Sequence, residues 1–175
     1  MRRRRSLALL VGTAALVLGA CGSDETAESE SPGVVDVTLT DFSFGDVPDE
    51  IPAGSRFQID NESETELHEL VAVRLEDGDD RTPREIVEAG LEEVLAAGPP
   101  ATVLLAAPGG QQIAAVGDGV IAAPGRYLLL CAIPTGADPQ KYLDAAATSD
   151  GPPDVDGGPP HFVNGMIDEV EVTDA

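Results

Sequence analysis

The segment Pro-Gly-Arg-Tyr-Leu-Leu-Leu-Cys, residues 124–131, leads from a turn signal through an apolar run to a cysteine. Pro124-Gly125 is typical of a turn, and the apolar residues that follow predict a buried β-strand over residues 126–133. Cys131 then lies close to the end of this strand. The other elements are predicted outward from it.

Short runs rich in β-branched residues, separated by glycine and proline, recur along the chain. We predict strands over 34–42 (continuing through Phe44), 56–61, 68–75, 101–107, 112–116, 120–122 and within 162–172. About seven short strands with such turns predict an all-β fold, a β-sandwich.

Residues 82–98 instead have a helical pattern. Thr82 is a cap residue, Pro83 suits the first helical position, and Glu85 completes a capping box. Apolar residues at helical spacing follow as far as Gly98, so we predict one inserted helix of about four turns. A shorter helix is predicted over 141–147, and the many prolines and glycines of 149–160 predict a loop.

The N-terminus has the pattern of an export signal, which we assign to residues 1–20. Four arginines precede an apolar run over residues 7–18 that is too short for a permanent membrane span. Leu18-Gly19-Ala20-Cys21 resembles a bacterial lipobox, which implies cleavage before Cys21 and a lipid on its thiol. An ordinary signal peptide with a chance cysteine is the alternative, and both Sec and twin-arginine export stay open.

The mature chain would begin with an acidic, flexible tether over residues 21–33, followed by one domain over residues 34–175. The net charge is −22, and all 32 acidic residues follow Cys21. Such a chain repels nucleic acid and anionic headgroups, so an electrostatically steered partner should be basic. The acidity could equally serve solubility or adaptation to salt.

Few soft metal-binding side chains follow the signal. If Cys21 is lipidated, Cys131 has no disulfide partner in an oxidising compartment, which leaves an inert buried thiol or a metal-bound thiolate. His68, His161 and Met166 are the other soft donors, and each alone would be explained by packing or surface exposure. Together, two imidazoles, a thiolate and a weak axial thioether make a type 1 copper site.

The order and surroundings of these residues resemble the cupredoxin family. His68 opens a strand, residues 124–131 are similar to the family's Pro-Gly-x-Tyr-x-x-x-Cys strand, and residues 161–166 resemble its His-x-x-x-Gly-Met end. The resemblance implies a Greek-key β-sandwich that binds one copper ion through His68, Cys131, His161 and Met166. The helix at 82–98 and the long Cys–His loop over residues 132–160 depart from the family's pattern.

The resemblance implies a single-electron carrier, held by its lipid at the outer face of the membrane. We expect a redox partner protein with a basic docking surface and no nucleic acid. Copper storage, delivery or sensing, or a metal-free binding module, are the alternatives. We do not expect an enzyme, because two histidines leave no second copper centre and no spare base.

Overall fold

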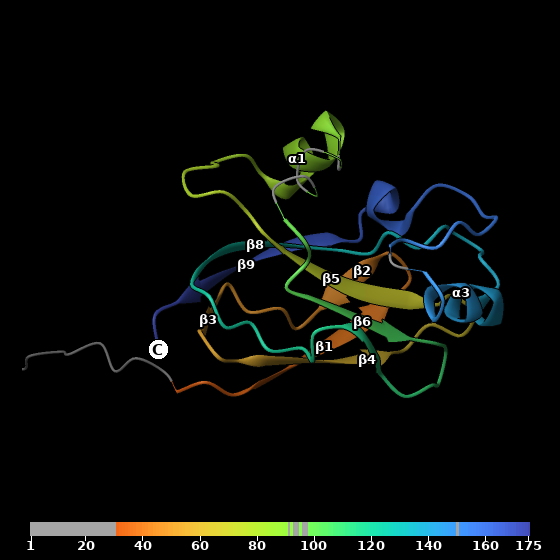
Figure 1. The fold of residues 1–175 in the computed structure, drawn as a ribbon, viewed down its shortest axis with the longest axis horizontal. Coiled ribbons are helices and arrows are strands. Elements are labelled where there is room, and N and C mark those ends of the chain that lie inside the picture. Colours follow the sequence, from red (N-terminus) through yellow and green to blue (C-terminus); the bar gives the residue numbers. More distant parts are fainter. Residues whose placement is uncertain (1–30, 91, 93–94, 96–97, 150) are drawn as a thin grey trace, which may run out of the picture.

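The computed structural model describes residues 31–90, 92, 95, 98–149 and 151–175. The predicted signal, Cys21 and most of the predicted tether lie outside the described residues. Two β-sheets pack face to face (Figure 1), which confirms the all-β sandwich predicted from the sequence. The described residues form nine strands rather than about seven.

The smaller sheet has the strand order β2-β1-β4. Strand β1 (Val34–Thr40) is parallel to β4 (Arg56–Asn61) and antiparallel to β2 (Ser43–Gly45). The prediction that the first strand continues through Phe44 is wrong. The chain turns at Asp41 and Phe42, where Phe42 has φ = 63°, so Phe44 pairs back onto Leu39 of β1.

The larger sheet has the order β3-β9-β8-β5-β6-β7. Its strands are β3 (Glu50–Pro52), β9 (Ile167–Thr173), β8 (Gly125–Leu130), β5 (His68–Arg74), β6 (Thr102–Ala106) and β7 (Ile113–Val116). The strand predicted over residues 120–122 does not form, because Val120 makes only an isolated bridge with Arg56. The short strands β2 and β3, which were not predicted, account for the larger number of strands in the structure.

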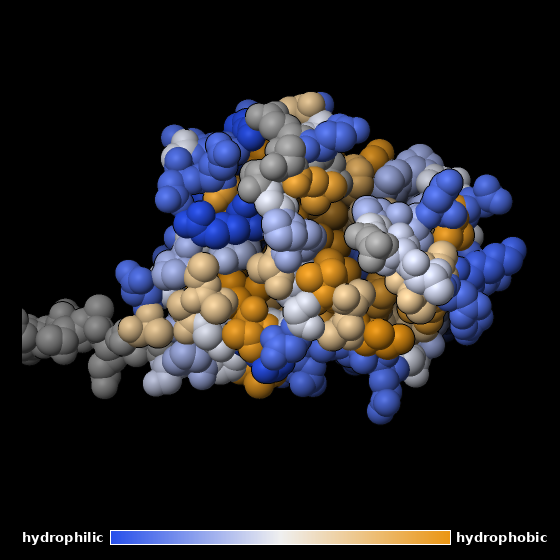
Figure 2. All heavy atoms as spheres, viewed as in Figure 1, coloured by the Kyte–Doolittle hydropathy of each residue, from blue (hydrophilic) through white to orange (hydrophobic). Residues whose placement is uncertain are grey.

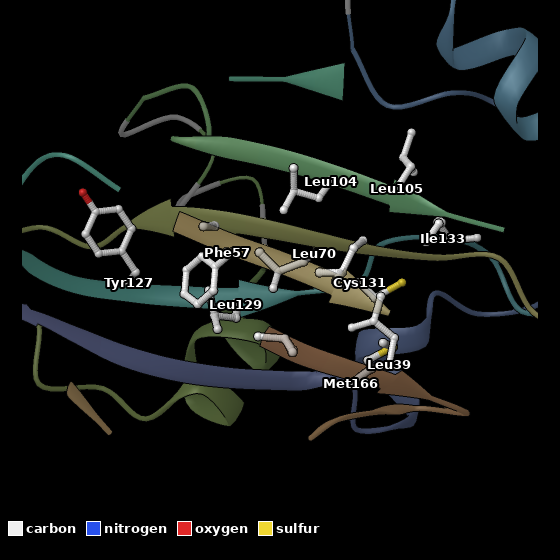
Figure 3. Packing of buried hydrophobic residues seen from close by; sticks show 14 of the residues in the cluster. Leu39, Phe57, Leu70, Leu104, Leu105, Tyr127, Leu129, Cys131, Ile133 and Met166 are labelled. Carbon is white, nitrogen blue, oxygen red and sulfur yellow. The ribbon is translucent and has the colours of Figure 1, made fainter. Parts of the chain in front are cut away.

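Strand β5 is buried on both faces, because its alternate side chains enter two different clusters. Leu70 and Ala72 face the core between the sheets (Figure 3), where they join residues of β1, β4 and β8. Val71 and Val73 point the other way and pack with Ile86 of the helical insertion. Burying one such aliphatic side chain contributes about 1.5–3 kcal/mol. The sheet that carries the candidate ligands is therefore held from both sides.

The helical insertion begins as predicted but does not form one continuous helix. Helix α1 (Pro83–Ala89) starts with the predicted capping box between Thr82 and Glu85. It ends at Gly90, which leaves the helical conformation with φ = 115°. Glu92 and Leu95 are helical again. The prediction of a single four-turn helix over residues 82–98 is therefore wrong.

Two further helices follow Cys131. One lies in the long segment between Cys131 and His161, and the other begins at His161. Helix α3 (Pro139–Ala146) confirms the predicted short helix, starting two residues earlier, with Asp138 as its cap. A 3-10 helix, η1 (His161–Asn164), precedes β9. Helix α3 lies at the end of the sandwich away from the C-terminus (Figure 1).

One face of the molecule has both hydrophobic and hydrophilic regions (Figure 2). Hydrophobic residues gather over the middle of the face in Figure 2, and hydrophilic residues border it. Within the part of the chain that the structure describes, no helix combines the length and apolar character needed to cross a membrane.

Candidate metal centre

The register of the larger sheet brings the candidate ligands to one end of it. His68 is the first residue of β5, and Cys131 directly follows β8. These strands are antiparallel neighbours with Val71 opposite Leu130, so the start of β5 meets the end of β8. Leu130 also pairs with Ile167 of β9, which places Met166 beside Cys131.

Three of the four candidate ligands lie within direct reach of one another. Nδ1 of His161 is 3.1 Å from Nδ1 of His68 and 3.3 Å from Sγ of Cys131. The nearest donor atoms of these three buried residues all lie within 4.8 Å of one another. The two rings are tilted at 58°, with centroids 4.8 Å apart.

These separations fit donors that share one ion. Metal bonds of about 2.0–2.3 Å to nitrogen and sulfur leave donor atoms about 3–4 Å apart. The donor set of two imidazoles and one thiolate is typical of Cu(II) and Cu(I) in trigonal sites. The residues present therefore fit a copper ion.

Burial keeps all three groups neutral in the metal-free protein. Burial, followed by the charge of the neighbouring His161, lowers the pKa of His68 to about 4. Burial also lowers the pKa of His161, against the opposing influence of Glu66. Burial raises the pKa of the Cys131 thiol well above its usual range, and the charge of Glu69 adds to this. Both imidazoles thus keep a free lone pair at neutral pH, and a metal cation would have to displace the thiol proton.

Met166, the predicted axial ligand, is fully buried in the same core as Cys131. Figure 3 shows both sulfur-containing side chains at the end of the cluster opposite Tyr127. The peptide N–H of Cys131 donates to the carbonyl of Met166 at 3.2 Å, and the N–H of Met166 donates to the carbonyl of His161 at 3.1 Å. Gly165 precedes Met166 with φ = 111°, a backbone conformation that residues with a Cβ avoid. The glycine of the sequence motif thus lets the chain leave η1 and enter β9 at Met166.

Backbone hydrogen bonds join the segments that carry the ligands. Phe162 N–H donates to the carbonyl of Cys131 at 2.9 Å, and His161 N–H donates to that of Ile133 at 3.0 Å. Glu69 N–H donates to Sγ of Cys131 at 3.4 Å, which links the residue after His68 to the thiol. The arrangement is therefore fixed by the backbone as well as by the side chains.

The long segment between Cys131 and His161 is closed at its base. Thr135 N–H donates to the carbonyl of Pro159 at 3.1 Å, and Gly158 N–H donates to that of Thr135 at 2.8 Å. Pro134 and Pro160 form an isolated β-bridge. We call this paired base the loop neck. It brings His161 back to Cys131. Most of the 29 intervening residues therefore form a loop beyond the neck and do not set the distance between the ligands.

Sequence reasoning missed four residues that surround the candidate ligands. Glu69 is buried, accepts a hydrogen bond from Ala132 N–H at 3.0 Å, and has its pKa raised by burial to about 7. The signal that could have identified it is its position as an acidic residue inside an otherwise apolar strand. The other three are Asp41, Phe42 and Glu66.

These three residues come from the turns that flank the site. Oδ1 of Asp41 is 3.9 Å from Nε2 of His68, and Oε2 of Glu66 is 3.3 Å from Nε2 of His161. The ring of Phe42 meets that of His161 edge to face, with centroids 5.1 Å apart. Neither Nε2 atom has a hydrogen bond of good geometry to any described residue. No sequence signal pointed to these contacts, because they depend on the conformation of the turns.

Comparisons with known proteins give only distant likenesses. Neither a protein-family model nor a curated protein matches the chain. The reduced auracyanin of Roseiflexus castenholzii is a similar solved structure, with 18% identity and a TM-score of 0.44; the match covers 82% of this chain and 98% of that one.

Two other solved auracyanins are similar to 82% of this chain. Auracyanin A, described as a "blue" copper protein of Chloroflexus aurantiacus, has 18% identity and a TM-score of 0.42, and all of it is covered. Auracyanin B has 16% identity and a TM-score of 0.37, and 91% of it is covered. The candidate metal centre is defined by this chain's own side chains.

Proposed function

We propose that this protein is a type 1 copper protein that carries single electrons at the extracytoplasmic face of a membrane. The observation that carries the proposal is the convergence of Nδ1 of His68, Nδ1 of His161 and Sγ of Cys131. His68, Cys131 and His161 are the proposed equatorial ligands, and Met166 is the proposed weak axial ligand. Copper, when bound, supplies a one-electron couple between Cu(II) and Cu(I).

The surrounding protein suits an electron carrier because it holds the donors in place before the metal arrives. The three ligand side chains are buried, and the segments beside them are joined by backbone hydrogen bonds. Donors that are fixed in this way change their geometry little between oxidation states, which keeps the energetic cost of electron transfer low.

The proposed location follows from the lipobox-like sequence. A lipid on Cys21 and a tether over residues 21–33 would hold the domain near the membrane while leaving it free to meet a partner. The domain would begin at residue 34, the first residue of β1.

An acidic pocket beside the ligands supports a basic partner. It is lined by the carboxylates of Asp41, Glu62 and Glu64 and by three hydroxyl residues, Thr40, Ser63 and Thr65. Asp41 is also the neighbour of His68, whose buried Nε2 faces it without a hydrogen bond. A lysine or arginine of a redox protein placed here would neutralise the pocket and approach a ligand.

Electron exchange with a cationic cytochrome c tests this function. We expect the copper-loaded protein to give a reversible one-electron wave and to exchange electrons at a rate that falls with ionic strength. The triple variant Asp41→Asn, Glu62→Gln, Glu64→Gln should react more slowly and depend less on salt. A protein that binds copper tightly but shows no reversible wave would favour storage or delivery instead.

A matched triple variant controls for the loss of charge. Asp36, Glu50 and Asp174 are exposed. Asp36 lies near the start of β1, Glu50 pairs with Glu171 in the C-terminal half of β9, and Asp174 directly follows β9. Neutralising them removes the same charge, and we expect a smaller effect on rate. Reduction potentials of all variants are measured as well, because Asp41 lies close to His68. Equal rates for both triple variants would argue against docking at this pocket.

A further inference from the structure

The outer edge of the His161 ring faces a carboxylate instead of solvent. Its Nε2 atom is fully buried and lies 3.3 Å from Oε2 of Glu66, whose side chain is only 16% exposed. On the opposite side of the ring, Nδ1 faces His68 and Cys131. His161 therefore lies between Glu66 and the proposed metal position.

Glu66 is held in place by its own turn. Its N–H donates to Oγ of Ser63 at 2.9 Å, and its carbonyl accepts from Nδ2 of Asn61 at 2.9 Å. The same amide of Asn61, which is buried, donates to the carbonyl of Ala106 on β6 at 2.7 Å. The backbone of Glu66 is thus tied to the sheet that carries His68.

The carboxylate also reaches the loop beside the neck. Oε2 of Glu66 accepts a hydrogen bond from Gly136 N–H at 3.0 Å. Gly136 follows Thr135, one of the residues that pair across the loop neck. One carboxylate oxygen thus contacts both the Cys–His loop and the ring of its final histidine.

We infer that Glu66 is a positioning residue for the copper site, an inference that rests on the proposed function. At 3.3 Å from Nε2 of His161, its carboxylate stabilises a proton on that nitrogen electrostatically and so favours the tautomer whose Nδ1 lone pair faces the metal position. In the metal-free protein, Nδ1 of His161 then accepts a hydrogen bond from Nδ1–H of His68, which accounts for their 3.1 Å separation. When Nδ1 of His68 binds copper, that proton moves to its Nε2 atom, which faces Asp41. Glu66 therefore organises the histidine pair before copper binds.

The same carboxylate should lower the reduction potential. The oxidised site carries one more positive charge than the reduced site, so a nearby negative charge stabilises the oxidised form more. Glu66 is largely shielded from water, so solvent screens it less than the exposed Glu64 two residues away. Removing the charge at residue 66 should therefore raise the potential more than removing it at residue 64.

Three variants separate the charge of Glu66 from its geometry. Glu66→Gln removes the charge but keeps an acceptor, Glu66→Ala removes both, and Glu64→Gln is the matched control. We expect a raised potential in both residue-66 variants and a copper affinity about 10- to 100-fold lower in Glu66→Ala. Melting temperatures of the metal-free proteins show whether each variant folds, and the glutamine variant keeps the test usable if the alanine variant does not.

A second readout needs no copper. Nitrogen-15 NMR of the apoprotein should show the proton of His161 on Nε2 in the native protein and in Glu64→Gln, and a mixture of tautomers in Glu66→Ala. Unchanged tautomer and potentials in both residue-66 variants would overturn the role of Glu66 while leaving a blue copper protein intact. A native protein that forms no blue complex would instead contradict the proposed function, and this inference with it.

Discussion

Nδ1 of His68 and Nδ1 of His161 lie 3.1 Å apart, although the two residues are 93 positions apart in the chain. His68 reaches this position as the first residue of β5. His161 reaches it because its N–H binds the carbonyl of Ile133 and the loop neck closes beside it. The histidine pair is thus assembled by the backbone.

Closing the loop neck requires a residue without a side chain at position 157. A Cβ there would lie 2.5 Å from Cβ of Pro134 and 3.1 Å from the carbonyl oxygen of Thr135. We expect Gly157→Ala to destabilise the protein by about 1–3 kcal/mol, as overpacking does, and to weaken copper binding. Urea unfolding and a competition titration with a copper chelator measure the two effects.

Gly151 offers the control for this change, because a Cβ at Gly151 would meet nothing within 4 Å. Gly151→Ala should leave copper affinity as it is in the native protein. Equal affinity in the two alanine variants would show that the neck does not set the distance between Cys131 and His161.

Met166 should tune the site without being essential for it. Met166→Leu conserves volume in the core, so the loss of stability should stay below about 1.5 kcal/mol. The leucine removes a weak donor that stabilises the oxidised metal, and we expect a blue protein with a higher reduction potential. Leu104→Met, a similar exchange on β6, is the control. A potential unchanged by Met166→Leu would exclude the thioether as an axial ligand.

Glu69 should make the pH dependence of the apoprotein unusually flat. Its pKa is about 7 in the fold, against an ordinary value of 4.5, so its contribution to stability falls as pH rises from 4.5 to 7. The pKa of His68 is about 4 in the fold and 6.5 otherwise, so its contribution rises over pH 4–6.5. The contributions of Glu69 and His68 to stability change with pH in opposite directions and largely offset each other.

Glu69→Gln removes the pH-dependent contribution of Glu69 to stability. The apoprotein of this variant should gain stability, relative to the native apoprotein, as pH rises from 4.5 to 7, by on the order of 2–3 kcal/mol. Urea unfolding of both apoproteins at several pH values measures the difference. A difference that stays constant over this range would mean that Glu69 does not titrate as its burial implies.

Much of the fold could be predicted because local patterns and tertiary packing agree. The alternation in residues 56–61 predicted β4, and the apolar residues that follow Glu69 predicted β5. Strands β2 and β3 have three residues each, too few to give a periodic signal. The end of α1 at Gly90 was missed because apolar residues continue at helical spacing beyond it.

The candidate site, like the fold, has residues that could be predicted from the sequence and residues that could not. His68, Cys131 and His161 could be proposed because soft donors are rare in this chain, and the fold brings them together. Glu66 and Asp41 carry no such signal among 32 acidic residues. Their contacts with the histidines depend on the turns after β1 and before β5, which only the folded chain defines.

Titration of the apoprotein with Cu(II) tests the central claim most directly, in a chain with Cys21→Ser so that Cys131 is the sole thiol. We predict one equivalent of copper and an intense visible absorption from thiolate-to-copper charge transfer, which Cys131→Ser should abolish. A colourless mixture with the native Cys131, or the same colour after its replacement by serine, would contradict the account.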